Sequence, residues 1–364
     1  MKNRFCFFML TFAVVLFTTS CFKEPVEWVD DGKVEIQLAG SGAATVDWGD
    51  DSITEIYSLL TYTDDNYFPY ECVYTHIYSD TSAPRNVTIY GENITHINCW
   101  GQKLTKLDVT NITSLKVLNC GCNQLTSLDV SKDAALIELH CGRNQLTNLD
   151  VSSYVNLISF SCGGNQLTNL DVSNNTNLTL LACWGNLLTN LDLRENIALE
   201  ELYCQEGQLE SIDLSGSVAL KILCCDENRL TSLDVSQNTM LTSITCWNNQ
   251  ITSLDLSENT ALSDLRCWSN QLANLTLGNK PELTRILAGN NRLTSLDASE
   301  SPKLENLNFS SNNLSATALD TFFETLHGNP TSGGWNKFLN IHNNPGSITC
   351  NSDIVTNKGW VVTE

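Results

Sequence analysis

One line of sequence recurs every 21 residues through the middle of this chain. Its pattern is close to L-x-x-L-x-C-x-x-N-Q-L-T-x-L-D-V-S-x-N, and successive copies follow one another without an insertion. A fixed period near 20 residues is typical of a solenoid, in which each copy is one turn and buries its apolar side chains only against the copies on either side. The copies begin at Leu115, Leu136, Leu157, Leu178, Leu199, Leu220, Leu241, Leu262, Leu283 and Leu304, after a looser copy at Ile94.

The spacing within one copy predicts the shape of one turn. Leu118 and Cys120 alternate with polar residues, which indicates a short strand with one buried face. Asn123 then turns the chain, and its amide is placed to hydrogen-bond backbone groups of the neighbouring copies. Leu125 and Val130 face the same interior from the return side. Stacking about ten such turns gives a continuous core with parallel strands along one curved face.

These positions resemble the bacterial leucine-rich-repeat family, and the internalin-like surface proteins in particular, over residues 94–314. The period, the leucine positions and the turn asparagine all agree with that family, whereas a cysteine in place of the second strand leucine departs from it. The resemblance implies an α/β-type solenoid that is mostly β. We expect a right-handed superhelix of 21-residue repeats over residues 93–315, with a cap at each end.

The first residues have the order of a targeting segment. Lys2 and Arg4 precede an apolar run over residues 5–17 that is too short to span a bilayer, and small residues lead to Cys21. This order resembles a bacterial lipoprotein signal, residues 1–20, which is cleaved ahead of a lipid-modified Cys21. An ordinary secretory peptide is the alternative.

The residues after Cys21 bear on location. The Phe-Lys-Glu stretch at residues 22–24 resembles in part a signal that sends some Bacteroidetes lipoproteins to the cell surface. We therefore expect a protein that is lipid-anchored in the bacterial outer membrane, on the cell surface, with the periplasmic face as the alternative.

A linker over residues 21–32 leads to residues 33–92, where β alternation replaces the 21-residue period. The Trp48-Gly49-Asp50 turn and the later strand over residues 74–78 resemble the PKD-type β-sandwich, with Asp51 where that module usually has glycine. We expect this β-sandwich-like module to cover the first turn of the solenoid.

The same turn holds a small acidic cluster. Asp47, Asp50 and Asp51 could bind Ca²⁺, but three carboxylates in one turn are more often turn-forming residues, and we favour that interpretation.

Residues 316–364 are predicted to form a C-terminal cap. Residues 316–326 have helical spacing of apolar side chains, and residues 338–341 predict one last strand. Trp360 belongs to a segment that we expect to lie as an apolar lid over the final repeat.

A cysteine occupies the same position in successive copies. Parallel stacked strands would place these thiols about 4.8 Å apart with their Cβ bonds pointing the same way. A disulfide requires converging Cβ bonds and a dihedral of about 90°, and zinc requires ligands that converge on one point. We therefore expect a column of reduced thiols that packs the core and binds no metal. The column is Cys99, Cys120, Cys141, Cys162, Cys183, Cys204, Cys225, Cys246 and Cys267.

A second column is acidic. Like charges about 5 Å apart repel, so each carboxylate is expected to be held by backbone N–H groups of its own turn. The serine two residues later in most copies can share that role. A chain of bound cations is the alternative. The column is Asp108, Asp129, Asp150, Asp171, Asp192, Asp213, Asp234, Asp255 and Asp297.

The position after each cysteine faces outward from the concave surface, and there the copies differ most. Four of the eight tryptophans of the chain lie at this position, although leucine and cysteine already fill the core. Exposed aromatic side chains with a few charged neighbours are typical of interface centres. The alternative is a tryptophan column that only packs on itself. The predicted ligand-binding residues are Trp184, Tyr203, Asp226, Glu227, Trp247, Asp264, Arg266 and Trp268.

Charge and motifs exclude other classes of function. With 20 basic and 41 acidic residues the chain has no basic stripe to neutralise phosphates, which argues against a nucleic-acid partner. The sequence has no G-x-S-x-G elbow, phosphate loop or H-E-x-x-H motif, so we expect no catalytic residues, no metal and no cofactor.

We therefore expect a cell-surface binding or adhesion protein that recognises a protein partner, of a host or a neighbouring cell, through its concave face. The alternative is a glycan-binding surface lipoprotein in which Trp184, Trp247 and Trp268 stack on sugar rings.

Overall fold

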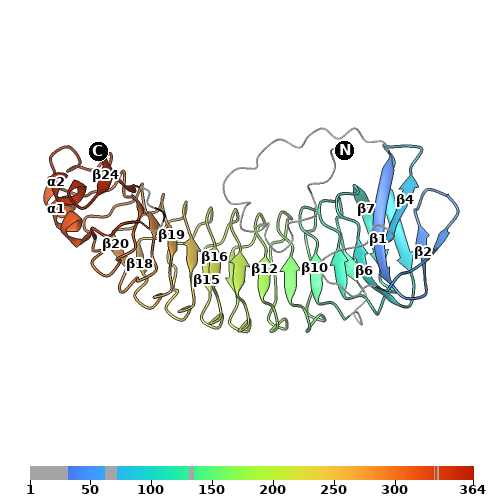
Figure 1. Ribbon diagram of the computed structural model, residues 1–364. Coiled ribbons are helices and arrows are strands. Elements are labelled where there is room, and N and C mark those ends of the chain that lie inside the picture. Colours follow the sequence, from blue (N-terminus) through green and yellow to red (C-terminus); the bar gives the residue numbers. More distant parts are fainter. Residues whose placement is uncertain (1–31, 62–71, 131–134, 332, 334–335) are drawn as a thin grey trace.

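The computed structural model describes residues 32–61, 72–130, 135–331, 333 and 336–364. They form one long, curved solenoid with a β module at one end and two helices at the other (Figure 1). The predicted signal peptide, Cys21 and nearly all of the linker lie outside the described residues. The mostly β solenoid of 21-residue turns that the sequence predicts is confirmed.

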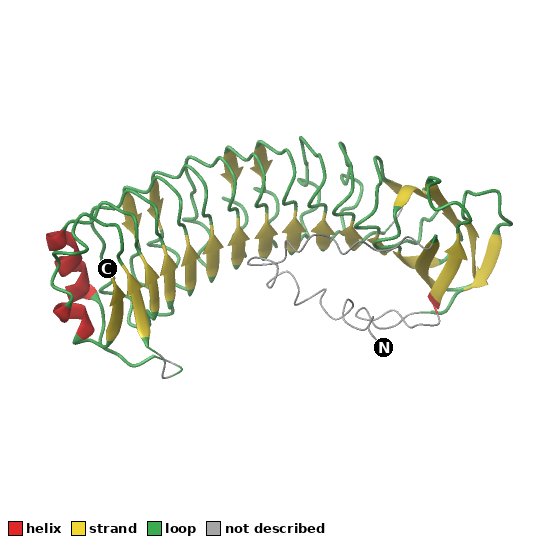
Figure 2. Cartoon of the chain, turned by 90° about the horizontal axis from the view of Figure 1, so that it is seen from above, coloured by secondary structure: helices red, strands yellow, loops and turns green. Residues whose placement is uncertain are grey.

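One sheet of 15 strands runs the length of the solenoid and lines the inner side of the arc (Figure 2). Each central turn contributes a three-residue strand that pairs in parallel with the strand 21 residues earlier, and the middle residue of each strand is buried. These strands follow β6 (Ile94–Asn98) and are β8 (Val117–Asn119), β10 (Glu138–His140), β11 (Ser159–Ser161), β12 (Leu180–Ala182), β14 (Glu201–Tyr203), β16 (Ile222–Cys224), β17 (Ser243–Thr245), β19 (Asp264–Arg266), β21 (Arg285–Leu287) and β22 (Asn306–Asn308).

The return side of the solenoid has shorter sheets. A five-stranded sheet has the order β3-β2-β5-β7-β9, and two further pairs are β13 with β15 and β18 with β20. On this side the members that belong to the repeats are β7 (Leu104–Val109), β9 (Asp129–Val130), β13 (Asn190–Asp192), β15 (Ser211–Asp213), β18 (Ser253–Asp255) and β20 (Asn274–Thr276).

The N-terminal module extends both sheets of the solenoid. It consists of β1 (Lys33–Gly40), β2 (Ala43–Asp47), β3 (Glu55–Ser58), β4 (Val73–Ile77) and β5 (Arg85–Tyr90). Strand β1 pairs antiparallel with β6, and β5 pairs in parallel with β7, so the backbone groups of the first turn are covered on both faces. The resemblance of this module to the PKD type and the domain boundaries stay predictions.

Within this module the acidic turn is held by local hydrogen bonds. Asp47 Oδ1 accepts the N–H of Gly49 at 2.9 Å, and Asp50 Oδ1 accepts the N–H of Ser52 at 3.2 Å. The other oxygen of Asp50 lies 2.7 Å from His76 Nε2. These contacts are those of turn-forming carboxylates, the interpretation that the sequence favoured.

The C-terminal cap closes the other end. Helix α1 (Ala316–Thr325) begins at Ser315, whose hydroxyl accepts the N–H of Ala318, and buries Leu319, Phe322 and Phe323. Strands β23 (Lys337–Asn340) and β24 (Trp360–Thr363) extend the long sheet in parallel, and α2 (Asp353–Thr356) lies between them in the chain. Trp360 is buried as predicted. Within the described ranges, neither helix has the length and apolar character needed to cross a bilayer.

The turn asparagine joins its own turn to the previous one by hydrogen bonds. Asn123 Oδ1 accepts the N–H groups of Gln102 and Leu104 in the previous turn at 3.0 and 2.9 Å. Its Nδ2 donates to the carbonyls of Cys99 and Cys120, each at 2.9 Å. These buried backbone groups have no strand partner, so the amide provides what water would otherwise supply. The bond from the leucine-position N–H and the bonds to the two carbonyls recur at Asn144, Asn165, Asn186, Asn228, Asn249, Asn270, Asn291 and Asn312.

A second line of donors on the return side was not predicted. Along this line a buried side chain donates to the backbone carbonyl 24 residues earlier. Four residue types act as the donor, namely the Tyr154 hydroxyl, the Asn175 amide, the Ser217 hydroxyl and the Lys280 ammonium, at 3.1, 3.0, 3.1 and 2.7 Å. The constraint at this position is therefore a donor for a buried carbonyl and not a particular side chain.

The cysteine column packs the core as predicted. All nine members are buried and none forms a disulfide. Burial raises the pKa of Cys120, Cys183 and Cys267 to about 12. A thiol with such a pKa stays protonated at neutral pH, and only the thiolate ligates metals or attacks disulfides. Ala288 and Phe309 continue the column in the last turns, also buried.

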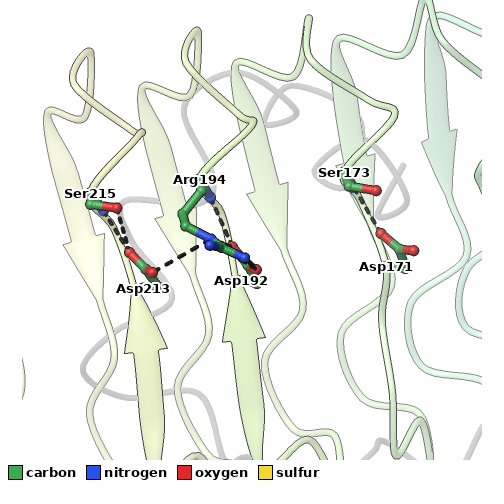
Figure 3. Close-up of polar contacts among 6 residues, drawn as sticks. All are labelled: Asp171, Ser173, Asp192, Arg194, Asp213 and Ser215. Carbon is green, nitrogen blue, oxygen red and sulfur yellow. Dashed lines mark hydrogen bonds and ion pairs between the residues drawn. The ribbon is translucent and has the colours of Figure 1, made fainter.

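The acidic column is also held as predicted. In eight of its members Oδ1 accepts the backbone N–H two residues later at 2.9 to 3.1 Å. These bonds hold the pKa of Asp171 below its ordinary value, with the backbone bond from Ser173 as the main cause. Figure 3 shows Arg194 at the position of the usual serine, where it contacts Asp192 at 2.6 Å and Asp213 at 3.6 Å.

The packing role of the cysteine column is testable at its centre. Replacing Cys183 by Ser should lower the free energy of unfolding by roughly 1–3 kcal/mol, because a hydroxyl is then buried without a partner where a thiol packed. Urea denaturation measures the change, with Cys183→Ala as the control that shortens the side chain without adding a polar group. A Ser variant as stable as the wild type would contradict the packing role.

Candidate functional site

The concave face presents three columns of side chains. The first and third residues of each short strand point outward, and so does the residue after the cysteine. This last set, here called the outer column, is the one that the sequence singled out. It runs Trp100, Gly121, Gly142, Gly163, Trp184, Gln205, Asp226, Trp247, Trp268, Gly289 and Ser310.

The tryptophans of the outer column pack along the solenoid axis. Trp247 and Trp268 are stacked with ring centroids 4.9 Å apart and planes inclined by 7°, as their place in adjacent turns predicts. Both are half-buried, as is Trp184, whereas Trp100 is 49% exposed. The expected open column of rings is therefore partly closed, because Trp247 and Trp268 cover each other.

Trp184 contacts residues of the two preceding turns. Its indole lies over Gly163, where an added Cβ would come within 2.5 Å of the ring, so a glycine is required there. The guanidinium of Arg143 lies 5.3 Å from the ring centroid, a cation–π contact. Arg143 was not among the predicted site residues. It follows a glycine of the outer column, and tracing that next position along the repeats would have found it.

Tyr203 lies beneath the surface rather than on it. It is 2% exposed and packs with Ala182 and Cys224, and its hydroxyl donates to Glu201 Oε2 at 2.9 Å. Burial raises the pKa of Tyr203, and the hydrogen bond to the Glu201 carboxylate is the second cause. Tyr203 was predicted to contact a ligand. With 2% exposure, its ring instead lies beneath the side chains of the concave face.

Asp226 is a buried carboxylate of the predicted set. It is 6% exposed, and its Oδ1 has no hydrogen-bond donor. Burial, together with the carboxylates of Glu227 and Glu206, raises the pKa of Asp226 to about 7, although a backbone hydrogen bond and the charge of Arg266 act in the opposite direction. Burial also raises the pKa of Glu206, with Glu227 as the second cause.

Glu206 and Glu227 are exposed and follow the outer column directly. Each adopts a left-handed backbone conformation, with φ of 57° and 53°, at the point where the chain leaves the concave face.

An ion-pair group closes the C-terminal side of the site. Asp264 Oδ2 lies 3.0 Å from Arg266 Nη2 and 3.2 Å from Arg285 Nη1, so one carboxylate faces two guanidinium groups. All three side chains are partly exposed. The structure thus brings Asp226, Glu227, Trp247, Asp264, Arg266 and Trp268 together on consecutive turns, with Trp184 two turns before Asp226.

Comparison with solved structures shows the fold. The functional domain of InlJ from Listeria monocytogenes, which includes a cysteine ladder, is 32% identical over 68% of this chain and 60% of the InlJ chain, with a TM-score of 0.54. The fold is a leucine-rich-repeat solenoid. An internalin, InlF, from Listeria monocytogenes is 21% identical over 69% of this chain and 81% of its own, with a TM-score of 0.52.

A third similar structure is the leucine-rich-repeat domain of APL1, 20% identical over 68% of this chain and 73% of its own, with a TM-score of 0.53. No family model and no curated protein matches the chain. This leucine-rich-repeat fold serves in general for protein interaction or adhesion rather than for catalysis. The InlJ domain is itself described as including a cysteine ladder, so a repeated cysteine is found within an internalin as well as in this chain.

Asp226 gives a test of the site through stability. Its pKa is higher in the folded chain, about 7, than the ordinary value of 3.8, so the folded state binds the proton more tightly than the unfolded state does. The free energy of unfolding should therefore fall as the pH rises from about 4 to about 7, and level off above that. Asp226→Asn removes this dependence.

The variant should be more stable than the wild type by roughly 1–4 kcal/mol at about pH 8 and similar to it near about pH 4. Urea denaturation across this range, with Asp234→Asn on the return side as the control, measures the difference. A variant less stable than the wild type at the higher pH would show that the charged carboxylate has a partner.

Proposed function

We propose that this chain is a cell-surface adhesion or binding protein that recognises a protein partner, of a host or a neighbouring cell, through the concave face. The observation that carries the proposal is the outer column itself. Its aromatic and charged side chains stand next to one another on successive turns, although leucine, cysteine and asparagine already provide the core and the turn bonds. Large aromatic side chains beside a few charges are what protein interfaces use at their centres.

A glycan remains the second candidate, because tryptophan faces also stack on sugar rings. Two contacts disfavour it. Trp247 and Trp268 cover one face of each other, and Arg143 lies over the ring of Trp184. Less aromatic face is thus open to a sugar ring than the sequence indicated, whereas a protein loop can contact ring edges and charged groups together.

The location is part of the proposal. The signal-like order of residues 1–20 and Cys21 support a lipid-anchored protein of the bacterial outer membrane, on its cell-surface or periplasmic side. Such a surface protein would present the solenoid to proteins outside the cell.

Removal of one ring tests the binding face. Partners are first sought by pull-down from host and neighbouring-cell extracts beside a glycan array, and the affinity for the purified partner is then measured. Trp247→Ala should weaken binding by about 2 kcal/mol or more, roughly 30-fold, without loss of folding, because the ring lies outside the core.

Asn174→Ala is the control for this experiment, since Asn174 is exposed on the return side and its amide donates to the Ser152 carbonyl, away from the concave face. Equal affinities of the two variants would contradict the proposed face. Loss of thermal stability in Trp247→Ala alone would assign the ring to packing.

The anchor has its own test. Cys21→Ala should release the protein from the membrane fraction and remove the mass of the lipid, because the acyl chains hold the protein at the bilayer. Cell fractionation followed by intact-mass spectrometry measures both. Membrane association and mass unaffected by the substitution would exclude lipidation at Cys21.

A further inference from the structure

Two buried acceptors on adjacent turns of the solenoid have no hydrogen-bond donor within the described residues. Asp226 Oδ1 and Gln205 Oε1 are both shut off from solvent, and neither has a hydrogen-bond partner within the described residues. They belong to consecutive turns of the outer column, because β14 and β16 pair in register, so their backbones are about 4.8 Å apart. An unpaired buried acceptor costs roughly 1–3 kcal/mol, which a donor from outside would recover.

Charge decides what kind of donor fits. Glu206 and Glu227 lie at the next position of the same two turns and add negative charge beside Asp226. Arg266 is the basic residue that acts on Asp226, and its guanidinium is bonded to Asp264 at 3.0 Å. With Asp226 ionised, the carboxylates of Asp226, Glu206, Glu227 and Asp264 outnumber the guanidinium groups of Arg143, Arg266 and Arg285, in a chain whose formal net charge is -21. A cationic donor is stabilised here both by the hydrogen bonds and by the negative electrostatic potential of the carboxylates.

The flanking rings favour the same conclusion. Gln205 and Asp226 lie between Trp184 and Trp247 in the outer column. Trp184 already has the guanidinium of Arg143 at 5.3 Å from its ring centroid, so a ring of this column accommodates a cation in this molecule. Asp226 is 6% exposed, which favours a slender lysine side chain over a sugar ring, and the carboxylate must rotate for its buried Oδ1 to meet the ammonium.

We propose that Asp226 and Gln205, between Trp184 and Trp247, bind a lysine ammonium of a partner protein. The inference rests on the proposed concave binding face and specifies the chemistry of its partner: a basic segment, with one lysine inserted at Asp226. The ammonium offers three donors and no acceptor, which matches two acceptors that lack donors. A divalent metal fits less well, since the described residues contain no group of three metal-ligating side chains.

The binding should depend on pH with a definite sign. Groups that act on Asp226 are Glu206, Glu227 and Arg266, and the neighbouring thiols of Cys224, Cys225 and Cys246 stay protonated because burial raises their pKa. An ammonium favours the ionised carboxylate, so affinity rises as Asp226, with its pKa of about 7, loses its proton. A neutral hydroxyl donor would show no such rise.

The test uses decalysine as the probe, with decaglutamate and cellohexaose beside it, and isothermal titration calorimetry at about 0.15 M salt. Decalysine should bind, more tightly at about pH 8 than at about pH 6. Asp226→Asn should weaken decalysine binding by at least about 10-fold and abolish the pH dependence. Asp234→Asn is the matched control: it removes the same charge from an exposed carboxylate on the return side, and its affinity should change less than about 2-fold.

Each of the following results would overturn the inference. Equal weakening by both substitutions would show that decalysine senses only the net charge. Absence of decalysine binding, or binding that Asp226→Asn leaves intact, would remove the lysine site. Cellohexaose binding that Trp247→Ala abolishes and Asp226→Asn preserves would assign the site to a glycan. If Trp247→Ala loses a purified protein partner while Asp226→Asn keeps it, the proposed function stands and this inference alone fails.

Discussion

The whole structure depends on hydrogen bonds for backbone groups that the strands leave unpaired. A turn of 21 residues has only three in its concave strand, so most of its N–H and C=O groups need other partners. Asn123 provides four such bonds, two from N–H groups and two to carbonyls, and its equivalents repeat three of them along the solenoid, one from an N–H group and two to carbonyls. Gly207 takes the place of this asparagine in one turn, and the bonds of Asn186 and Asn228 on either side are retained.

The need to bond every buried backbone group also explains why the return side accepts several residue types at one position. The carbonyl 24 residues earlier is satisfied by tyrosine, asparagine, serine or lysine, because any of them can aim a donor at it. Lys280 is the extreme case, with a fully buried side chain whose ammonium takes the place of an amide, and burial lowers the pKa of Lys280. This position of the turn therefore requires a hydrogen-bond donor, and several residue types can supply it.

A uniform core leaves the concave side chains free to vary. Leucine and cysteine pack the core and asparagine bonds the turns. Trp184, Asp226 and Trp247 are therefore not needed for the repeat to fold. These aromatic rings and this unpaired carboxylate lie within a few adjacent turns. A buried carboxylate without a donor among the described residues is unfavourable for stability, and its place beside Trp247 in the outer column supports a binding role.

The sequence by itself determined the solenoid, its short parallel strands, the reduced cysteine column, the bonded aspartates and the terminal helix, because nearly all of these depend on contacts that repeat with a fixed period. It also placed Trp247 against Trp268, since adjacent copies must stack. Only the tertiary structure decided that Tyr203 is buried, that Arg143 covers Trp184 and that Asp226 Oδ1 lacks a donor. Those outcomes depend on side-chain directions between turns, which differ from copy to copy and follow no period.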